Sequence, residues 1–271
     1  MYSCFHTVGL PDRSLAEAIE LVADAGYAAI ELNAEALPWA KAHITPAADK
    51  KARQAVVKTC KARGIIISAI SAHMAMVGAD PARRDAAIRF VEGSVDLARD
   101  VGAPVIHILS GPMEDGVDRN EAWNWFRGAV EETTVYAAGQ GIVLGIEAIA
   151  GHLFHCVGDY HALRRDLPGV PFKVNFDPSH LEVQGENPHR VVDELADQIV
   201  HVHLKDGKGS FPRFEFPPLG RGTIDFMGLV HDLRGAGYAG ALSVEYEAQV
   251  YGYHLSERQI LAEGIAFYDV L

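Results

Sequence analysis

Short apolar segments recur along the chain, and each follows a glycine that ends a charged, amphipathic segment. The pattern occurs in ADAGYAAIEL (23–32), KARGIIISAI (61–70), RDVGAPVIHI (99–108), GQGIVLGIEA (139–148) and LRGAGYAGALSVEYE (233–247). Glycine after a helix adopts the left-handed conformation that closes it, and an apolar run of about four to eight residues is typical of a buried strand. Strands that are apolar on both faces indicate a parallel sheet with crossover helices.

The pattern predicts eight strands with helices between them. The strands lie near 2–8, 27–33, 65–71, 104–109, 142–148, 171–177, 199–205 and 241–247, and the clearest helices at 14–25, 82–101, 121–139 and 256–269. Eight such units in 271 residues match the α/β fold class of a single (β/α)8 barrel. An open doubly wound sheet is the alternative, but no GxGxxG follows the first strand. No linker divides the chain, so we predict one domain over 1–271.

Polar residues alternate with apolar ones along the last four predicted strands. The alternating polar positions are Gly145 and Glu147; Lys173, Asn175 and Asp177; His201, His203 and Lys205; and Ser243, Glu245 and Glu247. One face of each barrel strand points to the interior, which is normally packed with Val, Ile and Leu. Inward polar groups therefore need partners or a function.

A candidate metal site emerges at the C-terminal ends of these strands, where barrel enzymes keep their catalytic groups. Glu147, Asp177, His203 and Glu245 come one from each strand. Taken alone, each would more often be a cap, an ion-pair partner or a core histidine. Together, three carboxylates and one imidazole favour Mn²⁺, Mg²⁺ or Co²⁺ over a thiolate-type zinc site.

Composition and charge limit the expected location and partners of the protein. A formal net charge of -12 disfavours nucleic acid and anionic membranes, and no apolar run is long enough to cross a bilayer. Three scattered cysteines without a CxxC and an N-terminus without signal-peptide features fit a reducing compartment. We therefore expect a cytoplasmic protein with no nucleic-acid or membrane partner.

Five segments resemble the xylose-isomerase-like barrels, specifically the sugar phosphate isomerase/epimerase family, and the resemblance covers essentially the whole chain. They are GIEAIAGH, VNFDPSHL, HVHLKDGKG, PLGRGTIDF and LSVEYE. The family includes ketose 3-epimerases, hydroxypyruvate isomerase, inosose dehydratase and, more distantly, endonuclease IV. The resemblance implies that Glu147, Asp177, His203 and Glu245 hold a divalent metal, with Mn²⁺ favoured, and that His180 contacts a substrate oxygen.

The resemblance implies isomerase or epimerase chemistry on a small keto-sugar or related polyhydroxy carbonyl compound. A metal bound to two neighbouring oxygens polarises the carbonyl and stabilises the enediolate formed on proton loss. Carboxylates on either side can remove and return the proton. Glu147 and Glu245 are the catalytic candidates, because the metal-bound glutamates do this in ketose epimerases.

Two positions depart from the ketose 3-epimerase pattern. Leu153 stands where a substrate-binding glutamate is expected, and Gly209 stands where an arginine is expected. Lys205 or Arg213 could replace that arginine. A lyase or dehydratase needs the same proton abstraction together with an acid near the leaving group, a part that His152, His155 or Lys205 could fill. This alternative stays open, including elimination from a keto-glycoside.

Two further classes are less favoured. A non-catalytic accessory subunit would have no use for a complete set of buried carboxylates, which is costly without a cation. An endonuclease-IV-like nuclease would need an Asp-x-His that PRFEFPPLGRG (212–222) lacks. No arginine pair or glycine-rich turn for phosphate is evident, which favours an unphosphorylated substrate.

Other predicted substrate contacts lie at neighbouring strand ends, together with one loop. They are His6, His73, His152, Lys205, Arg213 and Trp39, the last of which could instead pack a loop onto a helix. The long segment 206–222 is rich in Pro, Gly and aromatic residues, which is typical of a lid or specificity element. Exposed aromatics are also common at subunit contacts, so a homo-oligomer stays open.

Overall fold

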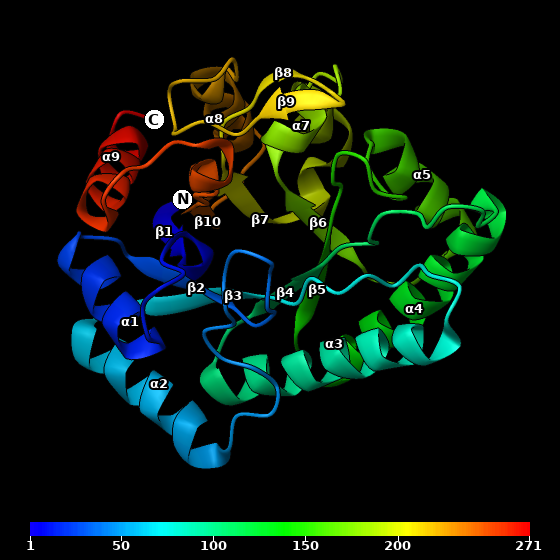
Figure 1. Cartoon of the computed structure of the whole chain (residues 1–271), viewed down its shortest axis with the longest axis horizontal. Helices are drawn as coiled ribbons and strands as arrows, with labels where there is room; N and C mark the ends of the chain where they lie inside the picture. Colours follow the sequence, from blue (N-terminus) through cyan, green and yellow to red (C-terminus); the bar gives the residue numbers. More distant parts are fainter.

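A closed ring of eight parallel strands forms the centre of the molecule in the computed structural model, which describes residues 1–271 (Figure 1). The order around the ring is β1-β10-β7-β6-β5-β4-β3-β2. The strands are β1 (Tyr2–His6), β2 (Ala29–Asn33), β3 (Ile66–Ser71), β4 (Val105–Ile108), β5 (Val143–Glu147), β6 (Lys173–Phe176), β7 (Ile199–Leu204) and β10 (Ala241–Val244). The predicted (β/α)8 barrel is confirmed, and the open doubly wound alternative is wrong.

Helices surround the ring (Figure 1). They are α1 (Leu15–Asp24), α2 (Lys50–Arg63), α3 (Pro81–Val101), α4 (Arg119–Gly139), α5 (Val157–Asp166), α6 (Pro178–Glu182), α7 (His189–Leu195), α8 (Phe226–Gly235) and α9 (Glu257–Asp269). As predicted, a glycine in the left-handed conformation closes α2 and α3. These residues are Gly64 and Gly102, with φ of 67° and 79°. No helix is long and apolar enough to cross a membrane.

The apolar core lies between strands and helices rather than inside the ring. One cluster of 62 buried residues includes Ile30, Ile146 and Val202, which alternate along their strands with inward polar residues. The strand pairing shifts register between Ile30 and Glu31, and again between Val174 and Asn175. Each irregularity lies directly before an inward polar residue, and such bulges commonly re-aim a side chain near a site.

The long segment after β7 folds as a two-stranded hairpin, β8 (Lys208–Ser210) and β9 (Arg213–Glu215), at the C-terminal side of the barrel (Figure 1). The carboxylate of Asp206 ties its two ends together by accepting from the backbone N–H groups of Gly207, Gly220 and Gly222 at 2.8 to 3.0 Å. Position 222 must be glycine, because a Cβ there would lie 2.1 Å from Asp206 Oδ1.

Candidate metal centre at the barrel mouth

Four buried residues bring their ligand atoms within 4.8 Å of one another: Glu147, Asp177, His203 and Glu245. We call them the mouth cluster. Nδ1 of His203 lies 3.0 Å from Glu245 Oε2, and 3.7 Å from an oxygen of each of the other two carboxylates. Neither His203 Nδ1 nor Asp177 Oδ2 makes a hydrogen bond of acceptable geometry. Their nearest charged neighbours are Glu245 Oε2 and Lys205 Nζ, and three carboxylates around one imidazole nitrogen form a donor set that fits a divalent cation.

Local contacts hold Asp177 and Glu147 in place. Asp177 caps α6, since its Oδ1 accepts from the backbone N–H of Ser179 at 2.8 Å, and Pro178 occupies the first turn. Asn175 donates from Nδ2 to Glu147 Oε2 at 2.7 Å. Asp177 thus uses Oδ1 to cap the helix and turns Oδ2 to the mouth, whereas Glu147 uses Oε2 both to accept from Asn175 and to face His203, 3.7 Å away. Lys173, at the opposite end of β6, instead contacts Gln198.

Lys205 supplies a positive charge inside the mouth. Its Nζ lies 2.8 Å from Asp177 Oδ2, 2.9 Å from Glu245 Oε2 and 3.2 Å from Glu247 Oε2. Burial by itself lowers the pKa of the Lys205 ammonium, but Asp177 and Glu245 raise that pKa well above its ordinary value. The lysine is therefore charged at neutral pH, yet one ammonium faces more than one carboxylate. This excess of negative charge also favours a cation.

Three of the predicted substrate-contact histidines border the mouth cluster. His180 Nε2 lies 3.6 Å from Glu147 Oε1 and 3.2 Å from Lys205 Nζ. His73 Nε2 lies 3.4 Å from Glu147 Oε2, and His6 Nδ1 lies 3.5 Å from Glu245 Oε1.

The protonation states of His180 and His152 follow from their surroundings. Burial, followed by the charge of Lys205, lowers the pKa of His180 to about 4. Burial likewise lowers the pKa of His152 to about 4, with a smaller effect from His180 and His73. Both rings are therefore neutral at pH 7. His152 is half-buried and pairs with Pro112 through an isolated bridge, while His155 turns away to contact Asp159.

Two other predicted residues are not brought to the mouth cluster. Arg213 is exposed on β9, and Trp39 lies half-exposed in the loop after β2, outside the main core. Their substrate roles stay predictions. The two departures from the epimerase pattern have structural reasons. Leu153 is fully buried in the core, and Gly209 has a φ of 89° with room for no Cβ, which would lie 2.8 Å from the carbonyl oxygen of Arg213.

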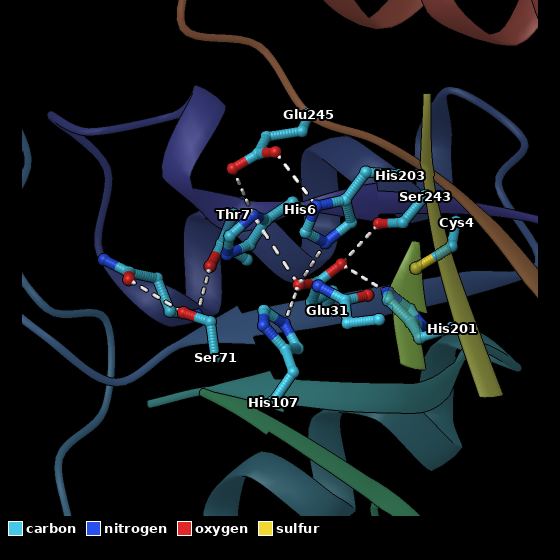
Figure 2. Close-up of polar contacts among 12 residues, drawn as sticks. Cys4, His6, Thr7, Glu31, Ser71, His107, His201, His203, Ser243 and Glu245 are labelled. Atoms are coloured by element: carbon cyan, nitrogen blue, oxygen red, sulfur yellow. Dashed lines mark hydrogen bonds and ion pairs between the residues drawn. The ribbon is translucent and has the colours of Figure 1, made fainter. Parts of the chain in front are cut away.

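Sequence reasoning missed several participants. Glu31, in the second predicted strand, was assigned no role, yet it lies fully buried and accepts from His203 Nε2 at 3.2 Å (Figure 2). Its signal was a charged residue within the apolar run YAAIEL. Glu35 is also buried, held by Ser71 at 2.7 Å. Phe216, from the segment 206–222, packs edge-on against His180 with ring centres 5.0 Å apart. No sequence pattern predicts this contact.

The fold and this geometry define a (β/α)8 barrel with a candidate divalent-metal centre at its mouth. The xylose isomerase-like TIM barrel family matches residues 19–270. The chain therefore belongs to the xylose isomerase-like TIM barrel family.

Relatives of the chain point to several reactions. It is 23% identical over 256 residues to SgbU of Escherichia coli (strain K12), provisionally named an L-ribulose-5-phosphate 3-epimerase, covering 89% of this chain and 88% of that protein. It is 32% identical over 112 residues to inosose dehydratase of Clostridium beijerinckii, covering 34% and 38%. A crystal structure of the IOLI protein with a bound zinc atom superposes with a TM-score of 0.79 at 16% identity, covering 99% and 96%.

Proposed function

We propose that the chain is a divalent-metal-dependent isomerase or epimerase of a keto-sugar or related polyhydroxy carbonyl compound, acting through an enediolate. The observation that carries the proposal is the mouth cluster, three carboxylates and one imidazole that are buried and whose ligand atoms lie within 4.8 Å of one another. Glu147, Asp177, His203 and Glu245 would hold the ion, with Mn²⁺ favoured and Mg²⁺ or Co²⁺ as alternatives. The bound cation supplies polarisation of the substrate carbonyl.

Glu147 and Glu245 are the proposed acid and base. They project from β5 and from the end of β10, with β6 and β7 between them in the ring, so they reach a substrate from different sides. Burial alone raises the pKa of both carboxyls, but His203 beside Glu147, and Lys205 with His203 beside Glu245, hold each pKa well below its ordinary value. Both groups are therefore ionised and able to accept a proton from carbon.

Lys205 and His180 are the proposed substrate contacts. The ammonium of Lys205 is a donor at neutral pH, and the neutral ring of His180 can donate to or accept from a hydroxyl. The Lys205 Nζ also lies 4.9 Å from the ring centre of Phe216, which closes one side of the mouth. Since Lys205 is already paired with Asp177, Glu245 and Glu247, we propose an unphosphorylated substrate, unlike the one that the name given to SgbU implies.

A lyase or dehydratase remains the second candidate, favoured by a specific observation. Leu153 is fully buried in the apolar core, and a Cβ at Gly209 would lie 2.8 Å from the carbonyl oxygen of Arg213, so neither position offers the polar side chain of the ketose 3-epimerase pattern. In this reaction Glu147 or Glu245 removes the same proton, and a β-leaving group departs with a proton from a nearby acid. Lys205 is the proposed acid, because it is charged, whereas His152 and His180 are neutral at pH 7.

Proton exchange in D₂O tests both candidates at once. The chain is stripped with a chelator, reloaded with Mn²⁺ and incubated with a panel of free ketoses, inososes and keto-glycosides. We expect deuterium to enter beside the carbonyl only with the reloaded protein, and NMR of the product separates an epimer from an eliminated enone. Stoichiometric Mn²⁺ binding without exchange in any panel member would refute the proposal and favour an accessory subunit.

A further inference from the structure

Below the mouth cluster, one buried carboxylate gathers four hydrogen-bond donors (Figure 2). Glu31 Oε1 lies 2.6 Å from His107 Nε2 and 3.2 Å from His203 Nε2. Its Oε2 lies 2.8 Å from His201 Nε2 and 2.6 Å from Ser243 Oγ. The donors come from β4, β7 and β10, so Glu31 on β2 joins strands from around the ring. We call this arrangement the Glu31 hub.

The hub determines which ring nitrogens carry hydrogen. An ionised carboxylate only accepts, so the Nε2 of each contacting histidine must be an N–H. In His203 this leaves Nδ1 as the nitrogen that faces the three carboxylates of the mouth cluster. In His107 it leaves Nδ1 facing His73 Nε2, 2.8 Å away, and His73 in turn lies 3.4 Å from Glu147.

Glu31 itself is poorly suited to hold an ion. A carboxylate offers about four lone-pair directions, and the two nitrogens on Oε1 with the two donors on Oε2 fill them. The ligand atoms of His6, Glu31 and His203 do lie within 4.8 Å of one another. Binding a cation there would however break hydrogen bonds of a fully buried carboxylate, which is costly.

We propose that Glu31 is a positioning residue that sets the metal affinity of the mouth. By holding the Nε2–H of His203, it leaves Nδ1 as the ring nitrogen that can bind the cation. By holding His107, it fixes the neighbour of His73. This inference rests on the proposed function, since it assigns Glu31 a role towards the ion that the mouth cluster would bind. Carboxylate partners of histidine ligands orient the ring, fix its tautomer and raise its basicity.

Two substitutions separate the contributions of Glu31. Glu31→Gln keeps the shape and one acceptor oxygen but removes the charge. Glu31→Met removes every acceptor. Loss of such a partner typically weakens metal binding about 10- to 100-fold. We expect the Mn²⁺ dissociation constant, measured by calorimetry on chelator-stripped protein, to rise about tenfold in Glu31→Gln and about a hundredfold in Glu31→Met.

Ser68→Ala is the matched control. Ser68 is buried in the same barrel interior but contacts Cys4 Sγ and the carbonyl oxygen of Ile30, not the carboxylate of Glu31. The Mn²⁺ dissociation constant of the Ser68→Ala variant should stay within twofold of the parent value. A second readout is the ring N–H of His203 in ¹⁵N-histidine-labelled, Zn²⁺-loaded protein. That proton should resonate far downfield in the parent and move upfield in Glu31→Gln, which a general loss of packing would not cause.

The possible results are distinct. Weaker Mn²⁺ binding with a shifted His203 proton in Glu31→Gln supports the positioning role, even if Glu31→Met fails to fold. Unchanged Mn²⁺ affinity in a folded Glu31→Gln overturns the positioning role and leaves the proposed function intact. A loss of Mn²⁺ affinity in Ser68→Ala equal to that in Glu31→Gln has the same meaning. A parent chain that binds no Mn²⁺ overturns both. A second ion per chain that is lost in Glu31→Gln would mean that the Glu31 hub is a cation site instead.

Discussion

The mouth cluster and the Glu31 hub share the ring of His203 and both combine buried carboxylate and imidazole groups, but their polar atoms are satisfied differently. In the hub, both oxygens of Glu31 have two donors each. In the mouth cluster, His203 Nδ1 and Asp177 Oδ2 make no well-aligned hydrogen bond and face Glu245 Oε2 at 3.0 Å and Lys205 Nζ at 2.8 Å. Burial alone therefore does not separate a structural carboxylate from a proposed ligand, whereas the number of well-aligned donors does.

Position along the strands accounts for the difference. Glu31 lies within β2, where neighbouring strands present side chains to it on several sides. Glu147 is the last residue of β5, and Asp177 and Glu245 come directly after β6 and β10. Residues at strand ends have fewer strand neighbours above them, so each of these carboxylates has fewer donors than Glu31 and is met mainly by Asn175 or Lys205. A barrel can thus place a supporting layer directly beneath a binding layer.

The largest effect is expected in the mouth cluster. Glu147→Gln and Glu245→Gln each remove a proposed proton acceptor, so deuterium exchange should fall about 10²- to 10⁴-fold. The rate is measured by NMR with whichever panel substrate exchanges in the parent. Glu17→Gln, a change on the exposed side of α1, is the control and should keep the parent rate. Retained exchange in both folded cluster variants would refute the assigned roles.

The second prediction concerns stabilisation by the ion. Mn²⁺ at about a hundredfold excess over its dissociation constant should raise the free energy of unfolding by about 2.7 kcal/mol, and a chelator should reverse this. Asp177→Asn should lose most of that response, since it removes the charge but can still cap α6. Urea unfolding with and without Mn²⁺ provides the measurement.

Asp80→Asn is a matched control, because Asp80 caps α3 in the same way by accepting from the N–H of Ala82. It should keep the full response to Mn²⁺. Equal responses in Asp177→Asn and Asp80→Asn would place the ion elsewhere in the molecule.

The mouth cluster was largely predictable from the sequence, whereas the hub was not. Alternation along a strand fixes which face a residue occupies, and this was enough to group Glu147, Asp177, His203 and Glu245. Five glycine-punctuated segments and eight predicted strands likewise predicted the barrel. These signals are local, and they depend only on residues close in the chain.

The hub depends on contacts between residues far apart in the chain. His107 and His201 could each have been a core histidine, and only the ring closure that brings β4 and β7 towards β2 makes them partners of Glu31. The register shift after Ile30, which precedes Glu31, has no signature in the sequence. The same applies to Phe216, whose contact with His180 depends on how segment 206–222 folds over the mouth.

A third prediction distinguishes the two sides of the hub. Ser243→Ala removes one of the two donors to Glu31 Oε2 and should lower the free energy of unfolding by about 1.5–2 kcal/mol, as expected for a buried bond to a charged group. The Mn²⁺ dissociation constant should change less than twofold, because His203 contacts Oε1 instead. Urea unfolding and calorimetry on one preparation give both values. A tenfold loss of affinity would mean that the carboxylate acts as one unit.

The smallest effect is expected at His43, a half-buried histidine outside both clusters that has no carboxylate partner. Its Nε2 donates to the carbonyl oxygen of Leu10 at 3.2 Å, and burial lowers the pKa of the ring to about 4. The unfolded chain should have a histidine pKa of about 6.5, so between these values it binds more protons than the folded chain. Stability therefore falls as pH falls through this window.

His43→Gln removes that dependence and should flatten the stability curve between about pH 6.5 and 4 by on the order of 1 kcal/mol, allowing for partial exposure. Urea unfolding at intervals across the window measures it, with exposed His231→Gln as the control. An unchanged slope would mean that His43 protonates as easily in the folded chain. In that case His43, which has no carboxylate partner, would not be more sensitive to acid than the histidines of the Glu31 hub. The two environments would then differ in geometry alone.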